Sequence, residues 1–547
     1  MANRTWRFAP FLAWPLVAAI ALAFRAPLAI DETRYLTVAW EMFLRGDWLL
    51  PHLNGVLYVH KPPLLFWLVG AGWKLFGVND WWPRLVPLIA SLAGMLATWR
   101  LARRLFPYAD DAPPLAAILA GGMVVWAATS TMIMFDMLLA ACVLTGLVGL
   151  AGAGAGDRRG WLIFGLGLGF GLLAKGPVAL LHLLPPAALG PVWSDVARAR
   201  RGRWYLGLSV AVALGLAVAL CWVVPAVLSG GSAYARAILW TQTADRVAAS
   251  FAHPRGWWWY LPVLPALVLP WTLWKPGLRG LRHAIRTMEP GARFCFAWAL
   301  PVFAGFCLVS GKQPQYLLPV LPAVGLLMAR GMATEQAMSY RAARALALLP
   351  LAALGLVVSS GFWPGWDYNG WLEDLNPMPM VAFWVVLAWA VLPFRVSLLE
   401  GAGRLSVAST LALSLCAVAL LGSAAGRAYA VGPAAREVAT LQAQGITVAY
   451  LGDYHGQLGY VGRLRRPLSE LANLADVDAL ARRDPGARVL IESRVNPLRA
   501  APQLPSSVIA YRSDFWSVWK ASQLARNPDI LEVINARWKP EQGESME

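Results

Sequence analysis

The sequence predicts an α-helical polytopic membrane protein of the kind that ends in a small α/β domain outside the cytoplasm. Three observations predict this class. Of the 547 residues, 58% are hydrophobic and only 14% are charged, whereas about 25% of the residues of soluble proteins are charged. Apolar runs separated by short basic loops continue to about residue 424. The remaining residues, 425–547, are polar and numerous enough to form one soluble domain.

Fourteen apolar runs approach the length of about 20 residues that a membrane-spanning helix needs. The first run follows Arg4 and Arg7, as a signal peptide would. No small-residue cleavage site comes after it, so we expect an uncleaved first helix. The runs cover residues 8–24, 63–78, 84–99, 114–131, 137–153, 161–174, 176–193, 205–228, 257–274, 293–310, 316–330, 345–361, 380–394 and 405–424.

Basic residues predict how many of these runs cross the membrane, because Lys and Arg are enriched in cytoplasmic loops. If the N-terminus and every basic cluster are cytoplasmic, an even number of crossings must precede Arg100. One of the first three runs therefore does not span. The run 63–78 follows Lys61 and contains Lys74, so we expect an interfacial helix there. The clusters are Arg100/Arg103/Arg104, Arg158/Arg159, Arg198/Arg200/Arg201/Arg203, Arg279/Arg282/Arg286, Arg341/Arg344 and Arg395/Arg404.

This parity predicts thirteen transmembrane helices within residues 1–424, with the first outer loop at 25–83. The N-terminus is then cytoplasmic and the domain 425–547 lies on the outer side. Within that domain, short apolar runs predict strands and the intervening periodic segments predict helices. The expected strands cover 446–451, 488–491, 508–511 and 515–519, and the expected helices cover 434–443 and 476–484.

Other features exclude several functions. The net charge of +17 comes from loops between apolar runs, so we expect a membrane partner and no nucleic acid. The five cysteines lie in apolar runs and form no CxxC pair, which argues against a disulfide framework or zinc ribbon. No phosphate-binding glycine motif of a nucleotide site is present. The glycines of residues 165–171 lie in an apolar run and predict close helix packing.

Three of the seven lysines fall in predicted outer turns, where positive charge is disfavoured. Lys61, Lys175 and Lys312 each lie next to or near a proline, in the segments HKPP, AKGP and GKQP. Cations that converge on one outer pocket would bind an anion such as phosphate. The alternative is that each lysine merely anchors a helix end at the interface. Tyr316 follows Lys312 and is either a site residue or part of the interfacial aromatic belt.

Acidic residues supply the second set of candidates. Asp31 and Glu32 follow the first apolar run directly, with Arg34 two residues further on. Asp136 is a single charge between two apolar stretches. A carboxylate near the membrane is energetically unfavourable and so indicates function. The alternatives are a helix N-cap for Asp31-Glu32 and an ordinary loop position for Asp136.

The outer loop 229–256 is long enough to have a function of its own. It carries Arg246, His253 and Arg255, of which the arginines could bind phosphate through both guanidinium nitrogens. A solvated basic loop is the alternative. His60, together with His52, could complete a site for a divalent metal with a carboxylate, so a metal cofactor is left open.

Four motifs in this order resemble a known family. They are D-E-x-R-Y at 31–35, H-K-P-P at 60–63, A-K-G-P at 174–177 and K-Q-P-x-Y-x-L-P at 312–319. Together they are similar to the polyprenyl-phosphate-dependent glycosyltransferases with the C-type membrane fold. That family includes protein O-mannosyltransferases and bacterial transferases that add aminoarabinose to lipid A. The layout of thirteen helices with an outer α/β domain is most similar to the latter.

The resemblance implies transfer of 4-amino-4-deoxy-L-arabinose from undecaprenyl phosphate to a lipid A phosphate, at the periplasmic face of a bacterial inner membrane. Asp31 matches the family's first acidic position, with Glu32 beside it, and Asp136 matches a second. Arg34 and the three lysines match positions around the donor phosphate. We expect a monomer. A protein O-mannosyltransferase, another sugar-lipid transferase of this fold and, from a different class, a lipid-phosphate transporter remain alternatives.

Overall fold

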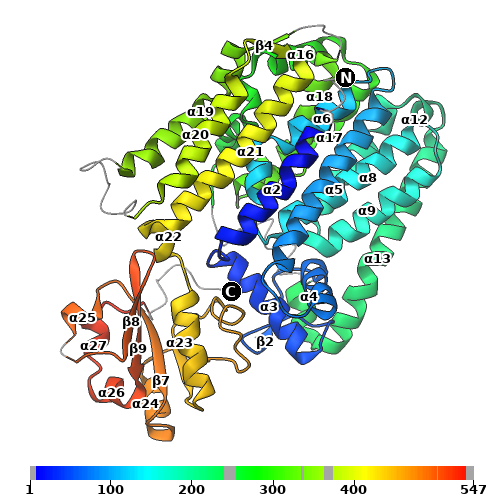
Figure 1. Cartoon of the computed structure of the whole chain (residues 1–547). Coiled ribbons are helices and arrows are strands. Elements are labelled where there is room, and N and C mark those ends of the chain that lie inside the picture. The colour runs from blue at the N-terminus through cyan, green and yellow to red at the C-terminus, as the bar shows by residue number, and fades with distance from the viewer. Residues whose placement is uncertain are drawn as a thin grey trace. The chain divides into compact units, whose positions relative to one another are not determined.

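The structure is a computed structural model that describes residues 6, 8–238, 254–333, 338–362, 374–501 and 503–537 (Figure 1). The chain forms two compact units, which are described separately. The helical unit contains residues 1–25, 59–368 and 375–419. The α/β unit contains residues 26–58, 369–374 and 420–547. Residues 26–58 thus belong to the same unit as the C-terminal part of the chain.

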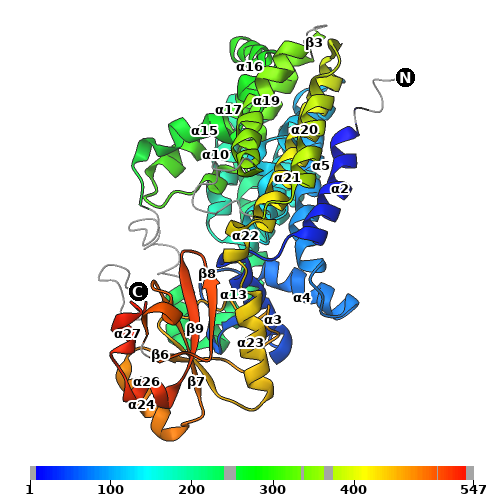
Figure 2. The same ribbon diagram turned by 60° about the vertical axis from the view of Figure 1, so that its left-hand side comes forward.

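The helical unit is built from apolar helices joined by short connections (Figure 2). A small two-stranded antiparallel sheet, β3 (Met338–Tyr340) with β4 (Arg395–Ser397), joins two segments of this unit that are distant in the sequence. Its helices are α2 (Ala9–Phe24), α4 (Leu64–Phe76), α5 (Trp82–Leu105), α6 (Ala112–Gly121), α7 (Val124–Ser130), α8 (Phe135–Gly154), α9 (Arg159–Lys175), α10 (Val178–Ala188), α11 (Gly190–Trp193), α12 (Asp195–Ala199), α13 (Arg201–Arg236), η2 (Trp257–Trp259), α15 (Tyr260–Leu267), η3 (Trp271–Leu273), α16 (Lys275–Thr287), α17 (Pro290–Leu308), η4 (Pro314–Leu317), α18 (Pro322–Met332), α19 (Arg341–Ser359), η5 (Ser360–Phe362), α20 (Pro377–Val391) and α21 (Leu398–Gly422).

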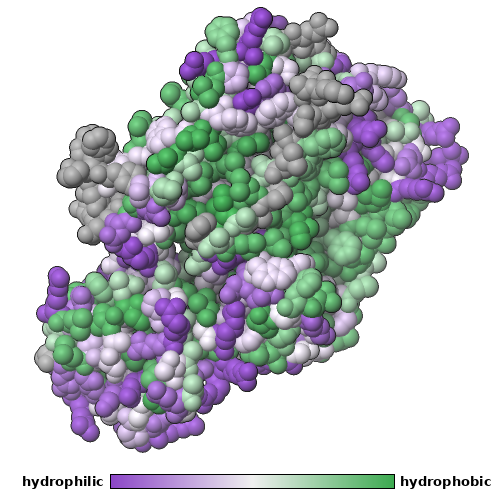
Figure 3. Space-filling view, viewed as in Figure 1, coloured by the Kyte–Doolittle hydropathy of each residue, from purple (hydrophilic) through white to green (hydrophobic). Residues whose placement is uncertain are grey.

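Six helices among the described residues are long and apolar enough to cross a membrane, and a bent pair would make a seventh. Large apolar side chains cover much of the outer surface of this unit, as Figure 3 shows. On α13, for example, Leu206 is 65% exposed and Leu228 is 79% exposed. Such a surface is stable in contact with lipid chains and unfavourable in water. The total of thirteen crossings stays a prediction.

Several of the expected spans are interrupted, and two of these contact each other at their breaks. The run 114–131 forms α6 and α7, which are bent by 67° at the break between them. The run 257–274 forms only short helices around Pro265 and Pro270. The two interrupted segments form hydrogen bonds with each other. The Val124 N–H donates to the Leu269 carbonyl at 2.9 Å, and Trp271 Nε1 donates to the Leu119 carbonyl at 2.7 Å. Buried backbone groups need such partners where a helix is interrupted.

Helix α4 corresponds to the run 63–78 and has only 13 residues. That length is short for a span, and its interfacial position stays a prediction. Among the described helices of more than ten residues, two were not expected from the sequence. One is α16, which carries Arg279, Arg282 and Arg286; the other is α3 (Asp31–Arg45) of the α/β unit. Both are amphipathic and too polar to be recognised by hydropathy.

Helices α8 and α9 approach each other closely because glycines line their contact. A Cβ atom added at Gly167 would lie 2.6 Å from Gly146 Cα, and one at Gly160 would lie 2.4 Å from the Gly149 carbonyl oxygen. The glycine-rich segment therefore packs helices together, as the sequence predicted. Asp136 lies in the first turn of α8, and Lys175 is the last residue of α9. The close packing of the two helices therefore also fixes the positions of these two residues relative to each other.

The α/β unit contains a five-stranded sheet in the order β6-β5-β7-β9-β8. Strand β5 is parallel to β6 and β7, whereas β9 is antiparallel to β7 and β8. Its elements are α3 (Asp31–Arg45), β1 (His52–Leu53), β2 (Val56–Leu57), α22 (Ala424–Ala428), α23 (Gly432–Ala443), β5 (Val448–Leu451), β6 (Ser469–Leu471), α24 (Leu474–Arg483), β7 (Arg488–Ser493), α25 (Pro497–Ala500), β8 (Ser507–Tyr511), β9 (Asp514–Lys520), α26 (Ala521–Arg526) and α27 (Ile530–Val533).

Helices cover both faces of this sheet (Figure 2). Val448 and Tyr450 pack with α23 on one face, and Ala449 and Leu451 pack with α24, α26 and α27 on the other. This alternation is the period of two that a strand imposes. The four strands and two helices expected in this part of the chain are present as β5, β7, β8, β9, α23 and α24, whereas β6 was not expected.

Candidate active site

In the helical unit, four segments that are distant in the sequence meet around one buried ion pair. Asp136 lies in the first turn of α8 and is 3% exposed. Lys175 is the last residue of α9, and its Nζ lies 2.5 Å from Asp136 Oδ1. The positive end of the α8 dipole favours the carboxylate, and the negative end of the α9 dipole favours the ammonium. Helix ends therefore stabilise both charges of the pair.

The turn after Lys175 requires glycine. Gly176 has φ 72°, in the region that side chains with a Cβ rarely adopt. A Cβ atom at this position would lie 4.0 Å from Pro62 Cγ, so the A-K-G-P turn lies beside the H-K-P-P segment. In that segment, Lys61 Nζ lies 5.9 Å from the centre of the Phe135 ring. Because Phe135 immediately precedes Asp136, Lys61 and Lys175 approach the same helix end.

Tyr316 completes this group. Lys175 Nζ lies 4.6 Å from the centre of the Tyr316 ring, within the range of a cation–π interaction. The Tyr316 ring in turn lies 6.2 Å from the ring of Phe306 on α17. Lys61, Asp136, Lys175 and Tyr316, which we call the lysine–aspartate cluster, thus combine two cations, one carboxylate and one phenol. The arrangement suits an anionic ligand that enters beside aromatic rings.

Lys312 has different surroundings. Its side chain is buried, and its ammonium donates to the carbonyl oxygens of Arg255, at 3.0 Å, and Val309. Next to it, the Tyr260 hydroxyl donates to the Gln313 carbonyl at 3.0 Å. These bonds fix the G-K-Q-P turn against the segment that contains Arg255. Lys312 therefore has a structural role in this arrangement, which its sequence position did not indicate.

The acidic motif lies in the other unit, on α3. Asp31 is exposed in the first helical turn. Glu32 is 1% exposed and accepts the Leu28 N–H at 2.7 Å. Arg34 is partly buried, and its Nε has no hydrogen-bond partner among the described residues. The helix cap is Ile30, so Asp31 is not the N-cap residue considered from the sequence.

Of the three candidates in the loop 229–256, only Arg255 is described; its guanidinium lies 4.1 Å from the centre of the Trp259 ring. Arg246 and His253 lie outside the described residues. Within the described ranges, no three His, Cys, Asp or Glu side chains are grouped so that they could hold a metal ion. His60 therefore belongs to no such group there. The aromatic residues Phe135 and Phe306 were not predicted, although Phe135 directly precedes the acidic candidate Asp136.

Residues 60–228 match the family described as dolichyl-phosphate-mannose-protein mannosyltransferase. A relative from Pseudomonas paraeruginosa (strain DSM 24068 / PA7) is 32% identical over 416 residues, which cover 68% of this chain and 74% of the relative. One from Serratia proteamaculans (strain 568) is 30% identical over 333 residues, 58% of each chain. Both are named undecaprenyl phosphate-alpha-4-amino-4-deoxy-L-arabinose arabinosyl transferase.

Among solved structures, ArnT from Cupriavidus metallidurans bound to undecaprenyl phosphate has the same fold. The TM-score is 0.72 at 21% sequence identity, and the match covers 94% of this chain and 98% of that one. The fold and the relatives thus define a multi-pass membrane glycosyltransferase with the C-type fold, as the sequence motifs predicted. Within that class, the chain belongs to the family of the undecaprenyl phosphate-alpha-4-amino-4-deoxy-L-arabinose arabinosyl transferases.

Proposed function

We propose that this protein transfers 4-amino-4-deoxy-L-arabinose from undecaprenyl phosphate to a phosphate group of lipid A. The observation that carries the proposal is the 32% identity, over 74% of its length, to a relative named for this donor. The lysine–aspartate cluster supports it, since its two ammonium groups provide binding chemistry for a lipid phosphate. The reaction belongs on the periplasmic side of the bacterial inner membrane, with the N-terminus in the cytoplasm.

The transfer is a single displacement. An oxygen of the acceptor phosphate forms a bond to the anomeric carbon while the bond from that carbon to the donor phosphate breaks. Undecaprenyl phosphate leaves with the electron pair and the added negative charge. Lys61 and Lys175 stabilise this charge, and the ring of Tyr316 contacts the Lys175 ammonium. Asp136 orients Lys175 for this role.

Asp31 is the residue that we assign to the acceptor side. A phosphate acceptor is already ionised near neutral pH because its second pKa is about 6. It therefore needs positioning more than deprotonation. The Asp31 carboxylate offsets the positive charge that grows at the anomeric carbon, with Arg34 on the same helix available to the anionic acceptor. Glu32 supports the turn that presents them, through its bond to the Leu28 N–H.

The test uses purified protein with undecaprenyl-phosphate aminoarabinose or mannose as donor, and lipid A or a Ser/Thr peptide as acceptor. Mass spectrometry should show lipid A that has gained one aminoarabinose. A glycosylated peptide would contradict the proposal and favour the O-mannosyltransferase alternative. Asp31→Asn should lower the single-turnover rate by about 10²–10⁴-fold, as the loss of a positioned carboxylate typically does.

The matched control is Asp110→Asn, which removes the same charge from an exposed carboxylate that makes no hydrogen bond among the described residues. Its rate should equal that of the parent. An Asp31→Asn rate within about threefold of the parent, in folded protein, would remove Asp31 from the mechanism.

A further inference from the structure

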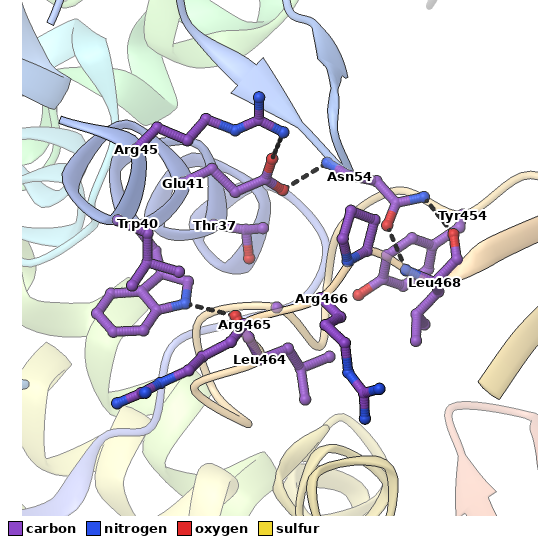
Figure 4. Close-up of a pocket in the computed structure, with 13 residues that line it drawn as sticks. Thr37, Trp40, Glu41, Arg45, Asn54, Tyr454, Leu464, Arg465, Arg466 and Leu468 are labelled. Carbon is purple, nitrogen blue, oxygen red and sulfur yellow. Dashed lines mark hydrogen bonds and ion pairs between the residues drawn. The ribbon is translucent and has the colours of Figure 1, made fainter. Parts of the chain in front are cut away.

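The α/β unit contains a polar cleft whose residues are distant in sequence from the lysine–aspartate cluster. The cleft is open to solvent, and the space in and in front of it amounts to about 470 Å³ (Figure 4). One wall is the α3 helix, with Trp40, Glu41 and Arg45. The other wall is the connection between β5 and β6, with Arg465 and Arg466. None of these residues belongs to the four sequence motifs.

The connection that forms this cleft is unusual for neighbouring parallel strands. Strands β5 and β6 are parallel and adjacent, and residues 452–468 join them without a helix. Parallel neighbours are ordinarily connected through a helix that covers the sheet. A long ordered connection without secondary structure is often functional. Its rigidity must therefore come from contacts with other segments.

Three contacts supply that rigidity. Thr37 Oγ1 donates to the Gly456 carbonyl at 2.6 Å and accepts the Tyr460 N–H at 2.9 Å. Trp40 Nε1 donates to the Leu464 carbonyl at 2.8 Å. Asn54, in the turn between β1 and β2, exchanges two hydrogen bonds with the backbone of Leu468, at 2.8 and 2.9 Å (Figure 4). Arg465 and Arg466 thus lie on a segment that is held on both sides.

Positive charge is in excess in this cleft. The only carboxylate of its lining, Glu41, accepts the backbone N–H groups of Asn54 and Gly55 and lies 4.0 Å from Arg45. Arg466 donates to the Gln442 carbonyl, which leaves its charge uncompensated. Arg465 is exposed and makes no hydrogen bond or ion pair among the described residues. An anion would therefore find two adjacent guanidinium groups that no described carboxylate neutralises.

We infer that this cleft binds a phosphate group of the acceptor headgroup, so that a phosphorylated sugar lipid is recognised by Arg465 and Arg466 as well as at the site of transfer. Guanidinium groups recognise phosphate oxygens through paired hydrogen bonds. Asp31 and Glu41 are separated by ten residues of the same helix, or about 15 Å at 1.5 Å per residue. A headgroup with two phosphates can present one to the cleft and the other for transfer. This inference rests on the proposed function for the identity of the acceptor.

The test compares Arg465→Gln/Arg466→Gln with Arg482→Gln in the full-length protein. Arg482 is a suitable control because it is exposed in the same unit, on α24, and makes no hydrogen bond or ion pair among the described residues. Equilibrium binding is measured with bisphosphorylated lipid A, monophosphorylated lipid A, phosphatidylglycerol and inorganic phosphate. Transfer kinetics are measured in parallel, with donor and acceptor varied separately.

The double variant should bind bisphosphorylated lipid A about tenfold more weakly, because charge-assisted hydrogen bonds to phosphate are lost. Its KM for that acceptor should be higher by a similar factor, and its KM for the donor should equal that of the parent. The control should behave as the parent. Unchanged binding in the double variant would overturn the inference. An equal loss with phosphatidylglycerol or inorganic phosphate would also overturn it, since the cleft would then be a general anion site.

The failure of the proposed function gives a different result. If the parent transfers no sugar to lipid A, yet binding of bisphosphorylated lipid A still depends on Arg465 and Arg466, the cleft is supported and the proposed reaction is not. If transfer proceeds and the double variant matches the parent in both binding and KM, the reaction stands and the cleft is not an acceptor site.

Discussion

Asp31 and Glu32 are adjacent in the chain but have opposite surroundings. Glu32 is buried and its carboxylate accepts a backbone N–H group, whereas the carboxylate of Asp31 is exposed and makes no hydrogen bond among the described residues. The Glu32 carboxylate accepts a backbone hydrogen bond and so stabilises the local fold. The Asp31 carboxylate faces solvent and is accessible to a substrate. The sequence placed both residues in the motif, but only the structure separates their roles.

At the ion pair, Asp136→Asn should destabilise the protein by about 3–5 kcal/mol, because it leaves the Lys175 ammonium buried without its counter-charge. Lys175→Met should have a similar effect through the unpaired carboxylate. The double variant should be much less destabilised than the sum of the two. Unfolding free energies in detergent provide the measurement.

Asp195→Asn, which breaks the exposed pair with Arg198, is the control, with an expected change below about 1 kcal/mol. Additive effects at the buried site would show that its two charges are not coupled.

Glu492 should make the α/β unit less stable as the pH rises. Burial raises the pKa of its carboxyl above 4.5, with the nearby Asp514 carboxylate acting in the same direction; Trp516 Nε1, which donates to it, and Arg537 act against the shift. Because the folded state holds the proton more tightly than the unfolded state, stability decreases from about pH 4.5 upward until the raised pKa is passed.

Glu492→Gln should therefore flatten this pH dependence and slow proteolysis of the α/β unit at neutral pH. Pulse proteolysis of the whole protein at several pH values measures the effect. Glu532→Gln removes an exposed carboxylate that makes no side-chain hydrogen bond or ion pair among the described residues, and it should leave the pH dependence as in the parent. A Glu492→Gln profile with the parental slope would exclude Glu492 as the source.

Among the elements, the apolar helices were the most predictable part of the fold. A continuous apolar run predicts a helix because a lipid environment requires internally satisfied backbone groups. The interruption between α6 and α7 was not predictable, since its stability depends on bonds to the distant residues Leu269 and Trp271. For the same reason, the sequence identified Lys175 and Asp136 as candidates but not their pairing, which the register of α8 against α9 determines.

That register provides a test at the scale of the helix pair. Gly167→Ala should destabilise the helical unit, because the new Cβ would lie 2.6 Å from Gly146 Cα and the helices would have to separate. Activity should fall as well, since Asp136 and Lys175 lie at the ends of these helices. Gly202→Ala is the control: no atom lies within 4 Å of its added Cβ, so stability should stay equal or increase by about 0.5–1 kcal/mol. Thermal unfolding and transfer rates compare the two, and equal stability would exclude close packing as the role of Gly167.

For the whole molecule, orientation in the membrane is the main prediction from the distribution of charges. Alkaline phosphatase, which is active only outside the cytoplasm, should be active when fused after residue 430. The same reporter fused after residue 157, beside the basic pair Arg158 and Arg159, should be inactive. Activity that follows the opposite pattern would reverse the proposed topology.

The α/β unit is formed by two parts of the chain that are distant in the sequence, and this determines when it can fold during synthesis. Its β5–β6 connection is held by α3 and the β1–β2 hairpin, which are synthesised roughly 400 residues before that connection. At about 5–20 residues per second, the ribosome needs roughly 20–80 seconds to cover this interval. During that time Thr37 and Trp40 lack the backbone groups of Gly456, Tyr460 and Leu464 that they bind in the folded unit, and a fragment that begins at residue 425 lacks Thr37 and Trp40 permanently. The unit can therefore complete its fold only after the last helix of the membrane part has been translated.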